Sequence, residues 1–380
     1  MPTVGINALL LALDDTYRSA GVSNYNAQLL RHLPAIAPDL GLVAFSGDPR
    51  FLPTADMTVQ RPLWSTRRPL ARIAWEQSGL SLASRRLDLL HGAVYANPLL
   101  AACPTVVTVH DLTFVHHAQA LKRFNRVYLR LITRLSARRA ARVIAVSENT
   151  RRELIDWLAL PPERIVTVPN GVSEEFSLAA PAAVAAFRQQ RHLPARFILF
   201  LGTLEPRKNV ARLIEAFSRA RLGADTYLVI AGSKGWYYEQ IFAQVAALAQ
   251  RSSIIFPGFI PAEQLPWWYR AATVFVYPSL YEGFGLPVLE AMASGTAVIT
   301  SNTSSLPEVV GDAAILVDPT DVDALAAAMV RLLNDEALRA QLSAAGVRQA
   351  AKFSWRRCAE ETVAVYRAAL GSPPTRERRV

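Results

Sequence analysis

The chain is predicted to be an α/β protein with two doubly wound domains, each a parallel sheet covered by helices on both faces. Short apolar runs rich in β-branched residues alternate with longer amphipathic stretches along the chain, which is typical of βαβ units. The 380 residues exceed what a single hydrophobic core usually organises, so two domains are expected. Apolar residues make up 51% of the chain and charged residues 19%, as in an ordinary globular protein.

The expected strands fall into two groups separated by a turn-rich segment. In the first half they are TVGIN, GLVAFS, LDLLH, TVVTVH and ARVIAV, and in the second half RFILFLG, TYLVIAG, SSIIFPG, ATVFVYP, TAVIT and AAILV. Between them, VPNGVSEEFSLAAP at 168–181 has Pro-Asn-Gly turn chemistry and little periodicity, so the hinge is placed there. The predicted domains are 1–172 and 173–352, and a final helix with its tail at 353–380 is expected to cross back to the first domain.

The composition argues against a membrane-spanning or disulfide-stapled protein. No apolar run reaches the roughly 18–20 residues of a membrane span, and VGINALLLAL is interpreted as a buried strand with its loop rather than a signal peptide. Cys103 and Cys358 are alone and far apart in the sequence, which supports neither a disulfide framework nor a zinc cluster. A cytoplasmic, reducing setting is therefore expected.

The chain has 41 basic and 31 acidic residues, and one segment is especially rich in basic residues. The segment 122–142 is predicted to form a basic amphipathic helix with Val127, Leu131 and Leu135 as its apolar face. Such a helix can lie against anionic lipid or hold an anionic acceptor, and a solvated surface helix is the alternative. Its basic residues recur every four positions: Lys122, Arg126, Arg130, Arg134, Arg138 and Arg142.

The stretch YEGFGLPVLEAMASGTAV places Glu282 before a glycine-rich turn and Glu290 inside the helix that follows. The helix N-terminus is an anion site, and Gly283 and Gly285 allow the backbone to approach a ligand closely. Carboxylates repel phosphate but accept hydrogen bonds from hydroxyl groups. A phosphate flanked by hydroxyl-bearing rings describes a nucleotide-sugar. The alternative is a capped loop with one satisfied and one solvent-facing glutamate.

The stretch FLGTLEPRKNVARLIEAF ends a buried strand at Gly202 and begins a helix near Asn209, with Arg207 and Lys208 at the helix start. Cations at that position oppose the helix dipole unless an anion is bound. The pair is suited to neutralise a diphosphate leaving group by charge and hydrogen bonds.

Polar residues follow several strands. His110 comes after TVVTV, Arg207 after FILFLG, and Glu282 after VFVYP. Ligands of doubly wound sheets bind beyond the carboxyl ends of the strands. The sequence therefore predicts a site between the two domains.

These motifs match a known family. EGFGLPVLEA resembles the paired-glutamate motif of retaining glycosyltransferase family 4, whose members have the GT-B fold, and similar stretches follow that family's order over almost the whole chain. The strongest likeness is to bacterial mannosyltransferases that build surface polysaccharides. The resemblance implies two Rossmann-like domains facing across an interdomain cleft. It also implies a retaining transfer of a hexose to a glycan or lipid-linked acceptor, with mannose from GDP-mannose as the expected donor. The other matching stretches are GTLEPRKN, VTVHDL, VSENTRREL, VPNGV, PGFIP and SSLPEVVGDAA.

The resemblance also implies roles for particular residues. Glu282 would bind donor-sugar hydroxyls and stabilise positive charge at the anomeric carbon, and Glu290 would hold the ribose hydroxyls. Arg207 and Lys208 would grip the diphosphate. His110 would contact the sugar near the reacting centre.

Backbone groups would complete the donor site. The amides of Phe284, Gly285 and Leu286 would assist at the diphosphate. Gly21 matches the second of two glycines in a loop that approaches the phosphates, and the backbone near Ile260 would face the base.

The chain departs from the family pattern at two positions. The usual glycine pair reads Ala20–Gly21 here, so this loop is expected to approach the phosphates less closely. Many relatives carry Arg directly after the strand glycine, where this chain has Thr203 following Gly202. More of the diphosphate charge is then left to the two basic residues at 207 and 208.

Neither a metal nor a cofactor is expected. The Asp-X-Asp in DPTDVD precedes a helical stretch, so a capping role for Asp318 or Asp321 is favoured over metal binding. The absence of Gly-x-Gly-x-x-Gly after a strand weighs against a nicotinamide dehydrogenase. Expected partners are the nucleotide-sugar and its acceptor, with peripheral anionic-membrane contact through 122–142 and no nucleic acid. Alternative functions are a UDP- or ADP-sugar-dependent transferase, a nucleotide-sugar epimerase and a non-catalytic GT-B partner subunit.

Overall fold

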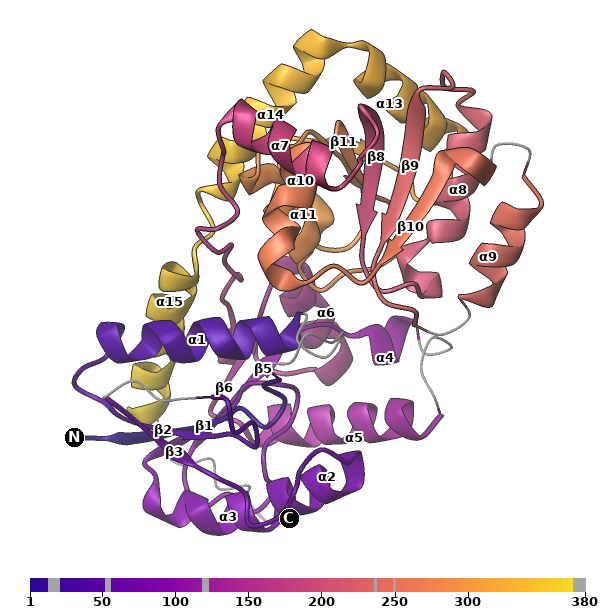
Figure 1. Cartoon of the computed structure of the whole chain (residues 1–380). Helices are drawn as coiled ribbons and strands as arrows, with labels where there is room; N and C mark the ends of the chain where they lie inside the picture. Colours follow the sequence, from indigo (N-terminus) through magenta and orange to yellow (C-terminus); the bar gives the residue numbers. More distant parts are fainter. Residues whose placement is uncertain (13–20, 52–55, 118–122, 236–237, 249–250, 372–380) are drawn as a thin grey trace. The chain divides into compact units, whose positions relative to one another are not determined.

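The structure, a computed structural model, describes residues 1–12, 21–51, 56–117, 123–235, 238–248 and 251–371 (Figure 1). The chain divides into two compact units. Unit 1 comprises Met1–Gly171 together with Trp355–Val380, and unit 2 comprises Val172–Ser354. The division at Gly171 falls within the turn-rich segment 168–181.

Unit 1 is built on a parallel sheet of seven strands in the order β3-β2-β1-β4-β5-β6-β7. The chain runs outward from β1 to β3 and then restarts at β4 on the other side of β1, so the topological switch point lies between β1 and β4. The strands are β1 (Thr3–Asn7), β2 (Gly41–Phe45), β3 (Met57–Gln60), β4 (Leu89–Gly92), β5 (Thr105–Val109), β6 (Arg142–Ala145) and β7 (Ile165–Thr167). The helices are α1 (Val22–Ile36), α2 (Pro69–Gln77), α3 (Gly79–Ala83), α4 (Thr113–His116), α5 (Arg123–Arg139), α6 (Glu148–Leu158) and α15 (Trp355–Leu370).

Helices cover both faces of this sheet, which explains why β5 is buried along its whole length. On one face Val107 and Val109 pack with α5 and α6. On the other face lies Thr108, whose hydroxyl is 2.8 Å from His91 Nε2, while His91 Nδ1 is 2.7 Å from the hydroxyl of Tyr366 in α15. Helix α15 therefore completes the core of unit 1.

Unit 2 is built on a parallel sheet of six strands in the order β10-β9-β8-β11-β12-β13. By the same reasoning its switch point lies between β8 and β11. The strands are β8 (Arg196–Leu201), β9 (Thr226–Ala231), β10 (Ile254–Gly258), β11 (Val274–Tyr277), β12 (Val298–Ser301) and β13 (Ile315–Val317). The helices are α7 (Pro181–Gln190), α8 (Val210–Arg219), α9 (Glu239–Ala246), α10 (Leu265–Ala271), α11 (Leu286–Ala293), α12 (Leu306–Val310), α13 (Val322–Asn334) and α14 (Glu336–Ala350).

Each of the eleven strands expected from the sequence is present, and the parallel doubly wound fold of both units is confirmed. Two short strands, β3 and β7, were not expected. None of the helices in the described ranges is long and apolar enough to cross a bilayer.

The basic helix differs from its prediction at both ends. α5 ends at Arg139, and Arg142 is the first residue of β6, while Lys122 lies outside the described residues. Of the predicted apolar face, Val127 and Leu131 are exposed and Leu135 is partly buried. The side chains that α5 buries are Ile132, Thr133, Ser136 and Ala137.

Candidate active site

Two loops meet at the switch point of unit 2. One follows β8 and forms a short 3₁₀ turn at Pro206–Lys208, and the other follows β11 and leads into α11. They are joined by a backbone hydrogen bond of 2.9 Å from Leu280 N to Arg207 O. The loops therefore hold the predicted diphosphate residues and the predicted sugar residue side by side.

Asn209 fixes the direction in which the first loop enters α8. It adopts a left-handed conformation with φ of 61°, which Asn tolerates better than most residues. Its Nδ2 donates to Pro278 O at 3.0 Å and to Pro319 O at 2.7 Å. These bonds anchor the turn that carries Arg207 and Lys208.

Four charged side chains form a cluster in these loops. Lys208 Nζ donates to Glu282 Oε1 at 2.6 Å, and Arg207 donates to Glu282 Oε2 at 2.8 Å. The other arm of Arg207 donates to Glu205 Oε1 at 2.6 Å. Two cations and two carboxylates give the cluster no net charge. The predicted residues at 207, 208 and 282 are thus brought together, and Glu205 joins them.

Neutral donors complete the surroundings of Glu282. Ser279 Oγ donates to Glu282 Oε1 at 2.6 Å, and the hydroxyl of Tyr277 donates to the same oxygen at 3.0 Å. Burial raises the pKa of Glu282, but Arg207 and Lys208, with hydrogen bonds from Lys208 and Ser279, lower this pKa to about 2. Glu282 is therefore ionised at neutral pH. Glu282 Oε2 accepts one hydrogen bond, from Arg207. Because a carboxylate oxygen can accept two, Oε2 can also accept a hydrogen bond from a sugar hydroxyl.

The loop after Glu282 presents the N-terminus of α11. Gly285 precedes the helix with φ of 109°, where a side chain would be strained and a Cβ would approach Leu306 to 2.8 Å. Ser305 Oγ is 2.9 Å from Glu282 O and 2.8 Å from Phe284 O, so the Ser305 hydroxyl holds the backbone of this loop. The first N–H groups of a helix have no acceptor within it, so this end suits an anion.

Glu290 lies in α11 and is held differently from Glu282. Its Oε2 accepts a hydrogen bond of 2.9 Å from the hydroxyl of Tyr269. Burial raises the pKa of Glu290 to about 8, Glu175 adds to the rise, and the Tyr269 hydrogen bond opposes it. The neutral acid form therefore predominates at neutral pH.

The other predicted positions of unit 2 lie along the same sheet edge. Gly202 follows β8, and the chain passes so close to it that a Cβ on Gly232 would lie 1.9 Å from Gly202 O. Thr203 is half-buried, and Ile260 after β10 is buried. The ligand contacts of these residues stay predictions.

His110 lies in unit 1, directly after β5. Its Nε2 is 2.9 Å from Ala93 O, and because a carbonyl only accepts, Nε2 carries the proton and Nδ1 is an acceptor. Burial lowers the pKa of His110, against smaller opposing effects of Ala93 O and Asp111, so the ring is neutral at pH 7. The ring of Tyr25 packs edge-on against it at 4.7 Å between centroids.

Gly21 caps the start of α1 with φ of 53°, a conformation that favours glycine. Among the described residues, no atom lies within 4 Å of the position that a Cβ would occupy there. Ala20 lies outside the described residues.

Of the two acidic residues after β13, Asp321 caps a helix and Asp318 holds the turn that precedes it. Asp321 Oδ1 accepts from Ala324 N at 2.9 Å and so caps α13, while Asp318 Oδ1 accepts from Thr320 N at 2.7 Å. Within the described ranges no three His, Cys, Asp or Glu side chains come together as metal ligands. That the reaction needs no metal stays a prediction.

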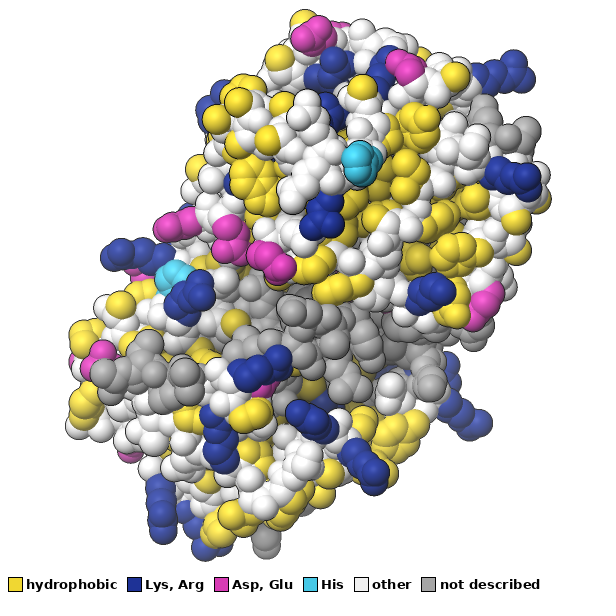
Figure 2. All heavy atoms as spheres, in the orientation of Figure 1, with side chains coloured by type: hydrophobic (Ala, Val, Ile, Leu, Met, Phe, Trp, Pro, Cys, Tyr) yellow, Lys and Arg dark blue, Asp and Glu magenta, His cyan; other side chains and the backbone are white. Residues whose placement is uncertain are grey.

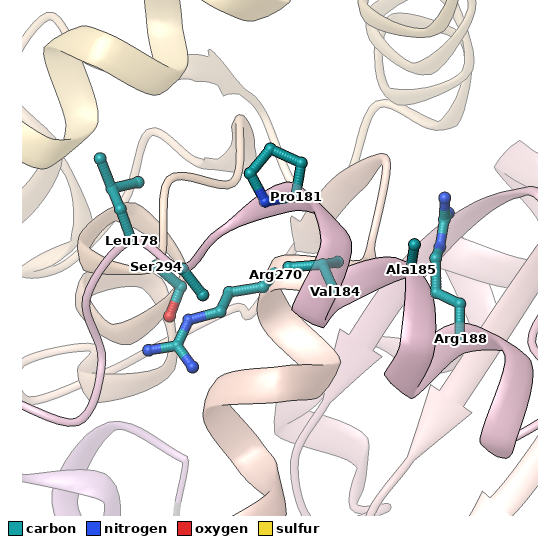
Figure 3. Close-up of a pocket in the computed structure, with 8 residues that line it drawn as sticks. Leu178, Pro181, Val184, Ala185, Arg188, Arg270 and Ser294 are labelled. Atoms are coloured by element: carbon teal, nitrogen blue, oxygen red, sulfur yellow. The ribbon is translucent and has the colours of Figure 1, made fainter.

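A pocket of about 330 Å³ lies elsewhere in unit 2, along α7 and α10 (Figure 3). Arg270 crosses it and is held by the carbonyl of Ser177 and by the ring of Trp267, with 4.9 Å from Arg270 Cζ to the ring centroid. None of the predicted site residues lines this pocket.

Sequence reasoning missed Glu205, Tyr277 and Ser279. Ser279 directly follows VFVYP, which is the same signal that identified Glu282, whereas Glu205 lies two residues before Arg207 and Tyr277 lies inside the expected strand. Polarity at strand ends therefore pointed to the right loops, although not to every member of the cluster.

Comparisons with known proteins agree with this fold. Residues 185–349 match the model described as glycosyl transferases group 1, and residues 19–176 match the one described as glycosyltransferase family 4. The chain is 36% identical over 265 residues to O-antigen chain mannosyltransferase B of Escherichia coli, covering 69% of this chain and 70% of that protein. It is 34% identical over 263 residues to the serotype-specific mannosyltransferase WbdA of Escherichia coli, covering 66% of this chain and 32% of that protein.

Solved structures share the fold. Sucrose-phosphate synthase from Thermosynechococcus elongatus superposes with a TM-score of 0.80 at 23% identity, over 97% of this chain and 98% of that one. Anabaena HepE, solved with UDP and glucose, superposes with a TM-score of 0.75 at 18% identity, over 97% of this chain and all of that one. The chain therefore belongs to glycosyltransferase family 4 and is a glycosyltransferase with the GT-B fold.

Proposed function

We propose that the enzyme is a retaining hexosyltransferase that transfers mannose from GDP-mannose to a glycan or lipid-linked acceptor in polysaccharide biosynthesis. The observation that carries the proposal is the meeting of Arg207, Lys208 and Glu282 beside the N-terminus of α11. Cations and helix amides suit a diphosphate, and carboxylates suit sugar hydroxyls. The mannosyltransferases among the relatives support mannose as the sugar.

The chemical step follows from this assignment. The bond between the anomeric carbon and the diphosphate oxygen breaks, and the acceptor hydroxyl oxygen bonds to the same face of that carbon. The hydroxyl proton passes to the departing diphosphate. Arg207, Lys208 and the α11 amides stabilise the negative charge on the leaving group, and Glu282 stabilises the positive charge on the sugar. Neutral His110 would accept a hydrogen bond from the sugar through Nδ1.

Glu290 has a distinct part in donor binding. Because its pKa is about 8, it enters the site as a neutral acid that both donates and accepts hydrogen bonds. A ribose diol offers both partners. A neutral side chain also avoids repelling the nearby diphosphate.

Ligand-dependent thermal unfolding tests the donor. The melting temperature is measured with GDP, UDP, ADP and NAD, each with and without magnesium. A ligand at 100 times its Kd adds about 2.7 kcal/mol of stability. We expect a metal-independent shift with GDP that is lost in Lys208→Ala. A shift in melting temperature with UDP or ADP alone would indicate a different nucleotide-sugar donor from GDP-mannose. No shift with any of the nucleoside diphosphates would refute the donor site.

Turnover separates transfer from other activities. A transferase releases GDP from GDP-mannose in proportion to the acceptor supplied, whereas an epimerase converts the donor without an acceptor. The anomeric configuration of the product, read by NMR, tests retention. An inverted product would refute the same-face mechanism.

A second proposal concerns the outer face of α5, where the enzyme would bind an anionic membrane surface from the cytoplasmic side. Phe124, Val127 and Leu131 are each more than half exposed on this helix, although they are hydrophobic. Arginines lie among them in sequence, and Figure 2 shows basic and hydrophobic side chains interspersed on the visible face of unit 1. An amphipathic helix of this kind binds by apolar burial together with attraction to anionic lipid.

Vesicle co-sedimentation tests this surface. Replacing Arg126, Arg130 and Arg134 by Gln should abolish binding to vesicles of phosphatidylglycerol and phosphatidylcholine. Binding to these vesicles should also weaken with salt because the attraction is electrostatic. The same substitution at Arg356, Arg357 and Arg367 on α15 is the matched control. Unchanged binding after the α5 substitutions would refute membrane contact through this helix.

A further inference from the structure

Glu205 belongs to the charged cluster of the candidate active site, yet the proposed chemical step gives it no part. It precedes the 3₁₀ turn Pro206–Lys208 and is 5% exposed. Its Oε1 accepts a hydrogen bond of 2.6 Å from Arg207 Nη2. Among the residues that the structure describes, Arg207 is the one cation with which Glu205 forms an ion pair. A buried carboxylate beside the predicted diphosphate residues is unexpected, because carboxylates repel phosphate.

Backbone hydrogen bonds hold the segment around Glu205 on both sides. Before it, Leu204 N donates to Ser233 O at 2.9 Å, which ties the segment to the chain after β9. After it, Lys208 N donates to Glu205 O at 3.0 Å and closes the turn. The backbone therefore fixes the position from which the Glu205 side chain reaches Arg207.

The two buried cations of the cluster have an anionic partner without Glu205. Glu282 accepts from Arg207 at 2.8 Å and from Lys208 at 2.6 Å. The carbonyl of Tyr281 also accepts from Arg207, at 2.6 Å. What Glu205 adds is a second negative charge, which brings the cluster of two cations and two carboxylates to a net charge of zero.

The charge of Glu205 acts on both cations. Burial lowers the pKa of Lys208, and the nearby charge of Arg207 adds to the fall, while the carboxylates oppose it. The Arg207 side chain is 15% exposed and lies between Glu205 and Glu282. An anion that binds to this guanidinium shares it with two carboxylates, and the like charges repel one another. A cluster that binds a diphosphate as tightly as possible would carry a net positive charge instead.

We propose that Glu205 is a positioning residue that limits the affinity of the site for a nucleoside diphosphate by offsetting the charge of Arg207. The inference rests on the proposed function, because it takes the diphosphate to bind at Arg207 and Lys208. Glu205 holds the guanidinium where it pairs with Glu282, and its negative charge reduces the attraction for the ligand. The diphosphate is also the product that leaves after transfer, so a moderate affinity favours turnover.

Calorimetric titration of the full chain with GDP tests this role. The key variant is Glu205→Gln, whose side-chain oxygen can still accept from Arg207 but which carries no charge. We expect the Kd for GDP to fall about tenfold, because the variant removes a negative charge close to the bound anion. The Kd for guanosine, which has no phosphate, should not change. Glu205→Ser, a second variant without the charge, should also lower the Kd for GDP.

A residue that served only the fold or the placement of Arg207 would give the opposite result, namely unchanged or weaker GDP binding in both variants, and this would overturn the proposal. An equal gain in affinity for guanosine would overturn it as well, since the effect would then not concern the phosphates. Glu205→Asp keeps the charge on a shorter side chain, so its Kd for GDP should be close to that of the wild type. Glu336→Gln, at an exposed position of α14, is the matched control and should bind GDP like the wild type. A Kd as low as that of Glu205→Gln in either of these would contradict an effect of the Glu205 charge.

A series of nucleotides separates this inference from the proposed function. If the wild type binds UDP or ADP rather than GDP, GDP-mannose is refuted as the donor, but the same gain in affinity is expected for that diphosphate in Glu205→Gln. Wild-type binding of GDP without a gain in Glu205→Gln and Glu205→Ser refutes the role of Glu205 and leaves the donor site standing. If the wild type binds none of the three diphosphates, the donor site and the role of Glu205 are both refuted.

Discussion

The loop ahead of α11 and the interior of α11 each carry one glutamate of the paired motif, and the two regions hold them in opposite states. In the loop, Glu282 receives hydrogen bonds from Arg207, Lys208, Ser279 and Tyr277, and its pKa falls to about 2. In the helix, Glu290 receives one from Tyr269, and its pKa rises to about 8.

The difference teaches that the number and charge of the donors decide whether a buried carboxylate stays ionised. Burial opposes ionisation at both positions. At Glu282 two cations and neutral donors outweigh this effect, whereas at Glu290 a single tyrosine does not. The motif therefore supplies one permanent anion next to the cations and one neutral acid. The anion, Glu282, can stabilise positive charge at a sugar carbon. The neutral acid, Glu290, can both donate hydrogen bonds to a diol and accept them from it.

Glu282→Gln should have the largest effect of the substitutions that test this comparison. The variant leaves Lys208 and Arg207 without their shared anion, and breaking a buried ion pair costs about 3–5 kcal/mol. We expect the free energy of unfolding in urea at pH 7 to fall by that amount. Glu263→Gln, at an exposed position of unit 2, is the control. Equal losses in the two variants would contradict the comparison.

The pH dependence of Glu282→Gln gives a second measurement of the same contact. Folding lowers the pKa of Glu282 from 4.5 to about 2, so its stabilisation is complete above pH 4.5 and is lost as the pH falls toward 2. The stability difference between wild type and variant should therefore shrink over this acid range. A constant difference from pH 7 to pH 2 would show that the carboxylate charge is not its source.

Glu290→Gln should have a smaller effect of opposite sign. Folding raises the pKa of Glu290 from 4.5 to about 8, so stability is lost as the pH rises toward and through 8. Gln resembles the neutral acid. We expect equal unfolding free energies at pH 5 and a variant about 2 kcal/mol more stable at pH 9, less than the full pKa shift because Glu290 is partly exposed. A variant that is less stable at pH 9 would contradict this.

The sequence predicted the fold well because buried parallel strands leave a strong local signal. β5 and β8 are almost continuous apolar runs, and they were found within a residue or two of their limits. β3 was missed because it has only four residues, of which Thr58 and Gln60 are polar and exposed. The helix at 122–142 was extended too far because a four-residue basic spacing continues into Arg142, where the backbone has already entered β6.

The site was predicted less completely, for a physical reason. Residue type and strand position indicated that Arg207, Lys208 and Glu282 would lie at one sheet edge, and they do. The same signals say nothing about how many donors reach a carboxylate. The opposite pKa shifts of Glu282 and Glu290 depend on which side chains point at each carboxylate, such as Tyr277 at the end of β11 and Tyr269 in α10, and residue type alone does not give these directions.

The smallest effects should come from removing one neutral donor from each carboxylate, and they sharpen the comparison most directly. Tyr269→Phe removes the hydrogen bond that lowers the pKa of Glu290, so this pKa should rise further above 8. The free energy of unfolding at pH 9 should then fall by about 1 kcal/mol. Stability at pH 5 should change less, because the neutral acid needs this donor less.

Tyr277→Phe is the matched change at the other carboxylate. Lys208, Ser279 and Arg207 still donate to Glu282 after it, so the pKa of Glu282 should stay far below 4.5. The two variants are compared by ¹³C NMR titration of the glutamate side-chain carboxyls. We expect a clear upward shift at Glu290 in Tyr269→Phe and a much smaller one at Glu282 in Tyr277→Phe. Equal shifts would mean that the cations do not dominate at Glu282, since a carboxylate held mainly by neutral donors responds to losing one of them.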